Sequence, residues 1–163
     1  DEVNKLGEGV KAIALPDERW DKVDIKTTNL IPNILAQTKA EKKFAYTAML
    51  FRDGICTEGA TSNVFAVKDG ILYTHPADNH ILKGITRQMI VTRVAPSLGI
   101  TLIEKEFDRA FVDDADELFF TDTIGGVIPI IKLDKNPVSG GKPGHVTLRL
   151  REALEKLMEE GLP

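Results

Sequence analysis

Short apolar stretches, each bounded by turn residues, recur through the first half of the chain. Their length and their β-branched and aromatic content are typical of strands. Arg-Asp-Gly at 52–54 and Lys-Asp-Gly at 68–70 are turn sequences that separate some of them. The pattern predicts strands at 10–15 and 23–26, then an antiparallel meander with strands at 46–51, 63–67 and 71–74.

Apolar residues recur at helical spacing in three other segments. A helix is predicted at residues 32–42, which begin with proline and continue with strong helix formers. A second is predicted at 85–98, ending at Gly99, with a kink in its last turn at Pro96. The third covers residues 146–160, where one apolar stripe faces a charged surface.

The remaining segments add strands and one short helix. Residues 100–107 and the apolar run 117–121 predict strands, and Asp108 is placed to cap a short helix over 109–115. The second of these strands leads into a glycine-containing loop at 122–129. Alternating strands and helices of these lengths predict an α+β fold with a mostly antiparallel sheet.

The composition of the chain argues against several classes of protein. At 163 residues and 42% hydrophobic content, residues 1–163 are long and apolar enough for a single domain with its own core. A net charge of −4 without a basic cluster argues against nucleic acid and anionic membranes as partners. Cys56 is the single cysteine, which excludes an internal disulfide, and no apolar run approaches the roughly 18 residues of a membrane span. No signal-peptide pattern is present, so the expected location is cytoplasmic.

Lys26 closes the predicted strand at 23–26 and is the first candidate for chemistry. An amine held in an apolar pocket loses part of its preference for charge and becomes a nucleophile that condenses with aldehydes. The alternative is an ordinary solvated lysine at a strand end, which is the commoner case. The residue alone does not decide between the two.

Glu58 is the second candidate, in the segment Cys-Thr-Glu-Gly-Ala-Thr-Ser-Asn at 56–63. A carboxylate beside tight backbone can pair with a protonated ring nitrogen and keep that ring cationic, so that it accepts electrons. A plain turn between strands explains the same residues without a ligand.

Two further segments predict anion binding. Gly84 precedes a helix, which leaves the amides of Ile85 and Thr86 free at its positive end beside the Thr86 hydroxyl. Leu82 could lie flat against a ring. In the loop at 122–129, Thr123 and successive backbone amides suit a phosphate or a substrate carboxylate. A glycine before any helix, and a simple hairpin, are the respective alternatives.

Metal chemistry is not predicted. The three histidines are scattered through expected loops without the spacing of a metal site. The acidic run near residue 115 is typical of a solvated helix end rather than of a cation site. These residues are His75, His80, His145, Asp113, Asp114, Asp116 and Glu117.

The four candidate segments, in their order and spacing, resemble the larger domain of the fold-type IV pyridoxal-phosphate enzymes. That group includes D-amino-acid and branched-chain aminotransferases, (R)-amine transaminases and aminodeoxychorismate lyase. The resemblance extends from about Gly7 to the end, and implies a pseudo-barrel or mostly antiparallel sheet with flanking helices. The segments that carry it are RWDKVDIKTTNL, TEGATSNVFAVKDGILYT, ILKGITRQ and TDTIGGVIPI.

The resemblance implies pyridoxal 5'-phosphate as cofactor and a role for each matching residue. Lys26 would be the Schiff-base lysine that also moves protons during catalysis, Glu58 the partner of the pyridine nitrogen, and Leu82 the residue under the ring. Cofactor contacts are implied for Gly84, Ile85, Thr86, Asp122 and Thr123, with Ile85, Thr86 and Thr123 at the phosphate. Substrate contacts are implied for Thr123, Ile124 and Gly125.

The implied reaction transfers an amino group from a D-amino acid, a branched-chain amino acid or an (R)-amine to a 2-oxo acid. The segments are most similar to those of D-amino-acid aminotransferases, and Ile31 stands where branched-chain enzymes often have tyrosine. The alternatives are a lyase on the same scaffold and a non-catalytic cofactor-binding or assembly module.

Members of the group have a smaller N-terminal domain that this sequence lacks. The resemblance therefore implies that the chain is either a fragment or receives that half from another chain, and that the enzyme is a homodimer.

Overall fold

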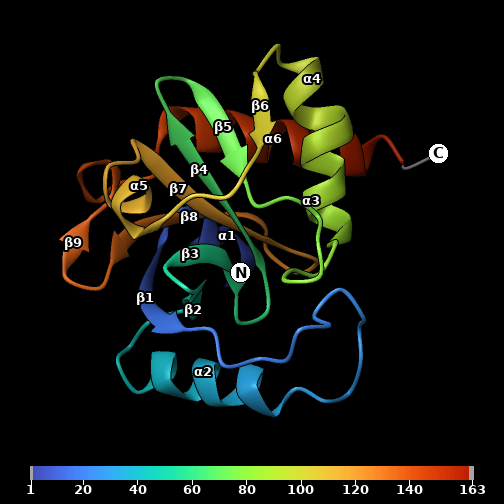
Figure 1. Ribbon diagram of the computed structural model, residues 1–163. Coiled ribbons are helices and arrows are strands. Elements are labelled where there is room, and N and C mark those ends of the chain that lie inside the picture. The colour runs from blue at the N-terminus through green and yellow to red at the C-terminus, as the bar shows by residue number, and fades with distance from the viewer. Residues whose placement is uncertain (1, 162–163) are drawn as a thin grey trace.

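The computed structural model describes residues 2–161, which form one curled sheet flanked by helices (Figure 1). Nine strands within this range make up the sheet, in the order β3-β2-β1-β8-β7-β4-β5-β6, with β9 paired to β8. The strands are β1 (Val10–Pro16), β2 (Thr47–Arg52), β3 (Ile55–Gly59), β4 (Asn63–Lys68), β5 (Ile71–Thr74), β6 (Leu102–Glu104), β7 (Glu117–Asp122), β8 (Gly126–Leu133) and β9 (Asn136–Pro137).

Antiparallel pairing predominates, as the sequence predicted. The pairs β2–β3, β4–β5, β4–β7, β7–β8 and β8–β9 are antiparallel, whereas β1–β2, β1–β8 and β5–β6 are parallel. The predicted simple meander is wrong. β3 pairs with β2 at one edge of the sheet, while β4 enters the other half between β5 and β7. The turn that joins β3 to β4 therefore connects the two halves of the sheet.

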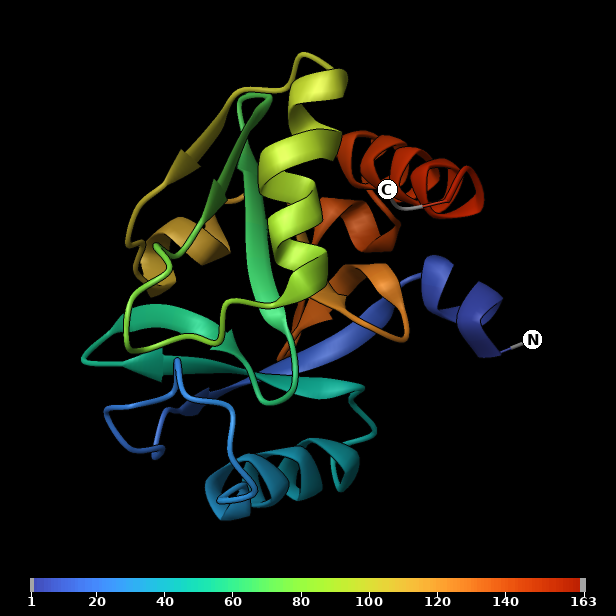
Figure 2. The same cartoon turned by 90° about the vertical axis from the view of Figure 1, so that its right-hand side faces the viewer.

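Helices cover the sheet from two sides (Figures 1 and 2). They are α1 (Glu2–Gly7), α2 (Ile31–Glu41), α3 (Ile85–Met89), the π-helical η1 (Ile90–Val94), α4 (Ala95–Ser97), α5 (Arg109–Asp113), the 3₁₀ turn η2 (Ser139–Gly141) and α6 (His145–Glu159). α3, η1 and α4 follow one another without a break. The π-helical segment η1 ends directly before α4, which contains Pro96, the residue at which the sequence predicted a kink. Asp108 caps α5 by accepting a hydrogen bond from the Phe111 amide, as predicted.

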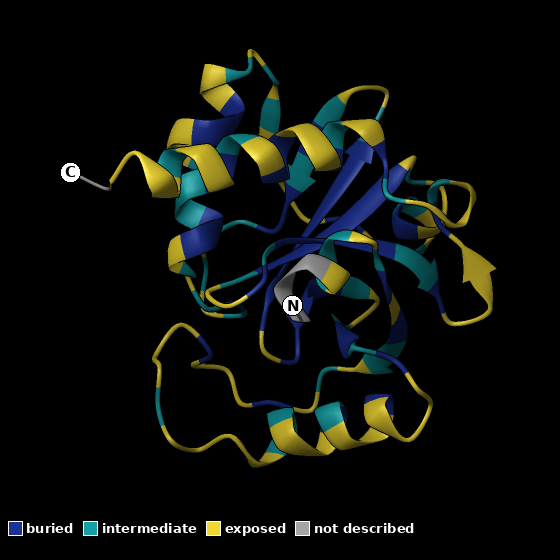
Figure 3. Cartoon of the chain, turned by 180° about the vertical axis from the view of Figure 1, so that it is seen from behind, coloured by how far each residue is buried: buried dark blue, intermediate teal, exposed yellow. Residues whose placement is uncertain are grey.

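Successive side chains of the central strands point to opposite faces of the sheet, which divides the core into separate layers. In β4, Val64 and Ala66 pack inside the curl of the sheet, whereas Phe65 and Val67 face α3–η1–α4 and α6. Phe65 stacks on Phe119 of β7 with ring centroids 4.9 Å apart. A third cluster joins β1 and β2 to α2 through small residues such as Ala36, Ala40 and Ala48. The central strands are consequently buried on both faces, and each long helix has one exposed side (Figure 3).

The segment between β1 and α2 is a loop and contains no strand. The prediction of a strand at 23–26 is wrong because this segment has no neighbouring strand to pair with. The Val23 amide donates to the Asn79 carbonyl at 3.0 Å, and the Ile25 amide closes a turn onto Lys22 at 3.1 Å. The loop thus forms a wall of the cavity described below. Among the described residues, no helix combines the length and the apolar character that crossing a bilayer requires.

Candidate functional site

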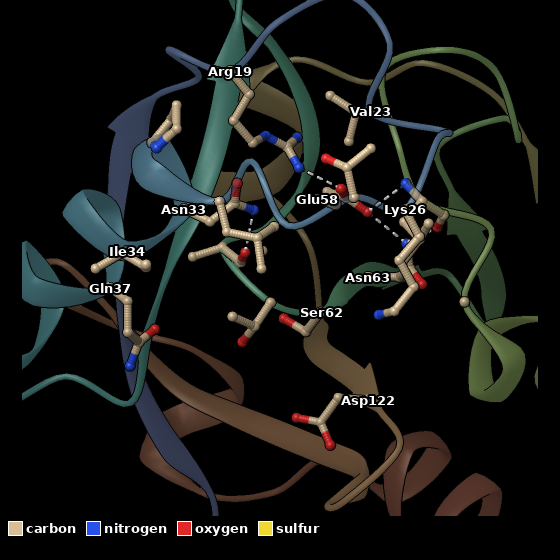
Figure 4. Close-up of a pocket in the computed structure, with 18 of the residues that line it drawn as sticks. Arg19, Val23, Lys26, Asn33, Ile34, Gln37, Glu58, Ser62, Asn63 and Asp122 are labelled. Carbon is tan, nitrogen blue, oxygen red and sulfur yellow. Dashed lines mark hydrogen bonds and ion pairs between the residues drawn. The ribbon is translucent and has the colours of Figure 1, made fainter.

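A cavity of about 780 Å³ opens where the loop after β1 and the helix α2 face the sheet (Figure 4). Its other walls are the β3–β4 turn, the start of α3 and the end of β7. Three of these elements are ends of strands or of a helix, where backbone amides and short polar side chains are available to a ligand. Eight of the predicted site residues line it together, namely Lys26, Glu58, Leu82, Gly84, Ile85, Thr86, Asp122 and Thr123.

Glu58 lies at the buried end of the cavity, on β3. Its Oε1 atom forms an ion pair with Arg19, and its Oε2 atom accepts hydrogen bonds from Asn63 Nδ2 at 2.8 Å and from the Leu82 amide at 3.0 Å. Burial raises the pKa of the Glu58 carboxyl to about 7, although the Arg19 charge acts in the opposite direction. A carboxyl whose pKa lies near 7 suits a partner that also gains and loses a proton, such as a ring nitrogen.

Arg19 belongs to the site, and the sequence analysis missed it. Its guanidinium forms a two-pronged pair with Asp17, from Nε to Oδ1 and from Nη2 to Oδ2, both at 2.8 Å. Burial opposes ionisation of Asp17, but its bonds with Arg19 and Thr57 lower the Asp17 pKa to about 2. Burial would likewise lower the Arg19 pKa, yet the two carboxylates raise it. A fixed positive charge therefore stands behind Glu58.

Lys26 lies in the loop and is exposed, so it is neither at a strand end nor buried in an apolar pocket. It lines the same cavity as Glu58, and the close-up shows it beside the wall that carries Asn63 (Figure 4). No hydrogen bond or ion pair joins its ammonium group to any residue of the described range 2–161. Its amine is therefore accessible to a ligand in the cavity.

The start of α3 presents backbone amides to the cavity. Within the described part of the chain, the amides of Ile85 and Thr86 have no acceptor, as expected for the first turn of a helix. The Thr86 hydroxyl donates to the Asp122 carbonyl at 2.9 Å, which joins α3 to the end of β7. Gly84 is required for the close approach, because a Cβ there would collide with the Asn63 side chain. These amides point an electropositive helix end at the cavity.

Three buried polar atoms in the cavity wall lack a partner among the described residues: Ser62 Oγ, Thr121 Oγ1 and Gln37 Oε1. Buried polar atoms in native proteins are almost always hydrogen-bonded to protein, water or ligand. They fit a polar molecule that makes several hydrogen bonds inside the cavity. None of the three was singled out in the sequence, because serine, threonine and glutamine carry no motif by themselves.

Asp122 changes the interpretation of the loop after β7. Its Oδ1 accepts from the amides of Ile124 at 2.9 Å and Gly125 at 2.6 Å, and its Oδ2 accepts from the Tyr46 hydroxyl at 3.0 Å. Burial and the Asp122 charge raise the Tyr46 pKa, so the phenol remains a donor. Two of the amides expected to bind a phosphate or a carboxylate are thus already occupied by Asp122.

The residues of this loop divide into two groups. Thr123 lines the cavity, whereas Ile124 is exposed outside it and Gly125 packs against Ile128. The predicted substrate contacts of Ile124 and Gly125 stay predictions, and the cavity wall offers them no direct support.

Comparison with known proteins gives this arrangement a context. The family model described as "Amino-transferase class IV" matches residues 4–133. The D-alanine aminotransferase of Staphylococcus aureus (strain COL) is 42% identical over 154 residues, covering 94% of this chain and 54% of that protein. The D-alanine aminotransferase of Bacillus licheniformis is 40% identical over 147 residues, covering 90% and 52%. The chain spans about half the length of the curated relatives it matches.

Solved structures agree with the fold. The branched-chain aminotransferase of Thermoproteus uzoniensis with norvaline superposes with a TM-score of 0.86 at 31% identity, covering 93% of this chain and 52% of that chain. The T.th. branched-chain aminotransferase complexed with N-(5'-phosphopyridoxyl)-L-glutamate has a TM-score of 0.86 at 29% identity, covering 98% and 55%. The predicted α+β architecture with its flanking helices is therefore confirmed.

Proposed function

The chain belongs to the class IV aminotransferases, and on that premise we propose that its cavity binds pyridoxal 5'-phosphate and serves the transfer of an amino group from an amino acid to a 2-oxo acid. The observation that carries the proposal is that Lys26 and Glu58, 32 positions apart in the chain, line one cavity together with the anion-binding start of α3. An accessible amine, a buried acid and an anion site are the three features that an aldehyde-bearing pyridine phosphate needs.

The residues of the cavity fit this cofactor end to end. Glu58 would accept a hydrogen bond from the ring nitrogen, and Leu82 would lie against the ring. The phosphate would be held by the amides of Ile85 and Thr86 and by the Thr123 hydroxyl. The buried hydroxyls of Ser62 and Thr121 supply further hydrogen-bonding groups to the same ligand. When bound, pyridoxal phosphate supplies an electron sink that stabilises negative charge at the substrate α-carbon.

Lys26 would act as nucleophile and proton carrier. Its Nζ atom has no competing partner in the described structure, so it is available to bond to the cofactor's aldehyde carbon. When the same atom is not bonded to the cofactor, it would serve as the base that takes up or returns the proton at the substrate α-carbon. Its position on an open loop gives the amine room to move between these two tasks.

Arg19 and Glu58 would keep the ring nitrogen protonated. The Glu58 pKa of about 7 places the carboxyl near the range in which a proton can be shared with the nitrogen. Arg19 favours the carboxylate form of Glu58 and so strengthens its ability to accept that hydrogen bond. By keeping the ring nitrogen protonated, Arg19 and Glu58 would make the ring a stronger electron acceptor. Neither residue would contact the substrate.

The amino donor and the partners of the chain are also proposed. The D-alanine aminotransferases among the relatives support a D-amino acid as donor. Apolar side chains of α2 remain uncovered beside the cavity mouth: Ile31 is 67% exposed, Ile34 60% and Leu35 53%. Additional protein, either a further domain or a second subunit of a homodimer, would cover this surface and complete the substrate side.

A spectroscopic titration tests the proposal. Incubation with pyridoxal phosphate should produce a visible absorbance band in the wild-type chain, and Lys26→Ala should abolish it. Lys22→Ala is the matched control, because Lys22 lies in the same loop but does not line the cavity. An unchanged band in Lys26→Ala, or loss of the band in Lys22→Ala alone, would refute the proposal that Lys26 bonds to the cofactor.

A further inference from the structure

The loop between β5 and α3 brings together three side chains that bind metals in other proteins. His75, Asp78 and His80 each offer one ligand atom, and these atoms all lie within 4.8 Å of one another. None of the three lines the cavity. The sequence spacing had not predicted a metal site, because the loop turns back on itself between Pro76 and His80 in a way that spacing does not reveal.

The hydrogen bonds of His75 leave an electrostatic problem that a cation would solve. Its Nδ1 lies 3.0 Å from the Cys56 carbonyl oxygen, which only accepts, so Nδ1 must carry the hydrogen. Its Nε2 lies 3.1 Å from Asp78 Oδ2, which is also an acceptor when ionised. A neutral imidazole would therefore direct a lone pair of the buried His75 ring at a carboxylate oxygen. A proton or a metal ion between these two atoms removes the repulsion.

The contacts around His75 and Asp78 resemble those that orient the ligands of metal sites. A carbonyl that accepts the hydrogen of one ring nitrogen fixes the tautomer and directs the other nitrogen to the ion. Asp78 Oδ1 accepts from the His80 amide at 2.9 Å, which leaves Oδ2 for the ion. His80 Nδ1 lies 4.0 Å from the same Oδ2, so a third ligand atom is close by. The side chains of Asp78 and His80 are 34% and 32% exposed, so an ion can enter from solvent.

We propose that His75 Nε2, Asp78 Oδ2 and His80 Nδ1 bind a first-row divalent cation of the Zn²⁺ type, with water at the fourth position. Two imidazoles and one carboxylate suit this class of ion. Bond lengths of about 2.0–2.1 Å in a tetrahedron place ligand atoms about 3.4 Å apart. The His75–Asp78 pair is already near that value. The other two pairs, which lie within 4.8 Å, need only a modest shift, which rotation of the partly exposed His80 ring can supply.

An ion here would stabilise the backbone that positions Glu58. The His80 carbonyl accepts from Arg19 at 3.3 Å, and two residues later the Leu82 amide donates to Glu58. The His75 carbonyl accepts from the buried Arg87 of α3 at 2.8 Å. Metal binding would therefore stabilise the segment that joins β5 to the anion-binding start of α3.

Titration of the cofactor-free full chain with Zn²⁺ by calorimetry, and with Co²⁺ by visible absorbance, tests this site. We expect one equivalent to bind, with a Co²⁺ spectrum that shows nitrogen and oxygen ligands. Asp78→Asn and His80→Ala should each weaken binding at least about tenfold. His145→Ala is the control, since that exposed histidine begins α6 and should leave the affinity unchanged.

Thermal unfolding provides a second measurement. Zn²⁺ should raise the melting temperature of the wild type and of His145→Ala, but not of Asp78→Asn or His80→Ala. Equal Zn²⁺ affinity in all four proteins would overturn the proposal. An absence of binding at one equivalent would do so as well, and would assign the His75–Asp78 contact to a shared proton. Neither result depends on pyridoxal phosphate, so the proposed amino transfer is tested separately.

Discussion

The two ends of the cavity are built in opposite ways. At one end, Glu58 is buried and its oxygens are held by Arg19, Asn63 and a backbone amide. At the other, Lys26 is exposed on a loop and has no partner in the described chain. A group that must hold a ring at a fixed protonation state benefits from a rigid shell. A group that must form and break a bond benefits from a side chain that is free to move. The two ends of the cavity should therefore respond differently to mutation.

The largest expected effect is on stability at the Glu58 end. Arg19→Ala would leave the buried Glu58 without its cation and the buried Asp17 with only Arg52, whose Nη2 lies 3.6 Å from Asp17 Oδ1. It should lower the free energy of unfolding by about 3–5 kcal/mol in urea denaturation. Arg109→Ala removes a partly exposed arginine paired with Asp113 and Asp134, and should cost at most about 1 kcal/mol. Similar losses in the two variants would show that the Glu58 shell is not the rigid end of the cavity.

The raised pKa of Glu58 predicts a dependence of stability on pH. Because the folded state binds the proton more tightly than the unfolded state, this carboxyl's contribution is fully present below its ordinary pKa of 4.5 and is lost as pH rises towards 7. The loss should total up to about 3 kcal/mol. Glu58→Gln should flatten the curve of unfolding free energy against pH in this window. A wild-type curve that is flat or rises between pH 5 and 7 relative to that variant contradicts the prediction.

The Ser62 hydroxyl has no hydrogen-bond partner among the described residues. Its removal should have a smaller effect, on ligand affinity rather than on stability. Ser62→Ala should leave stability unchanged or slightly higher, because a buried hydroxyl without a partner is removed. The Kd for pyridoxal phosphate should rise roughly fivefold, about 1 kcal/mol. Ser97→Ala, on α4 away from the cavity, should change the Kd in neither direction. An unaltered Kd in Ser62→Ala would place the ligand elsewhere.

The smallest expected effect on folding is at Lys26. Lys26→Ala should change the free energy of unfolding by less than about 0.5 kcal/mol, because an exposed side chain without partners contributes little. Denaturation of the cofactor-free variant beside the wild type measures this. A loss of several kcal/mol would mean that Lys26 is a structural residue.

Local patterns predicted much of the fold. The helix at 31–41, the central strands β4, β5 and β7 and the Asp108 cap follow from periodicity and from turn residues. Spacing alone did not place β3 and β4 in opposite halves of the sheet, because long-range pairing depends on the whole fold. For the same reason residues 23–26, which resemble a strand locally, form a loop.

The site residues that lie in recognisable sequence segments were predicted. Those whose role depends on pairing with a charge far away in the sequence were not. Lys26, Glu58 and the start of α3 were singled out from the sequence, and the structure brings them to one cavity. Arg19 was missed because its importance comes from burial beside Glu58, 39 positions away. The available signal was an arginine two residues after an aspartate, following a predicted strand. The cluster of His75, Asp78 and His80 likewise depends on how one loop folds.

Reductive trapping tests the central claim most directly. The chain would be incubated with pyridoxal phosphate, reduced with borohydride, digested and mapped by mass spectrometry. We predict one stoichiometric pyridoxyl label on the peptide that contains Lys26, and none on the peptides that contain Lys22 or Lys83. A label distributed over several exposed lysines, or its absence from Lys26, would contradict the assignment.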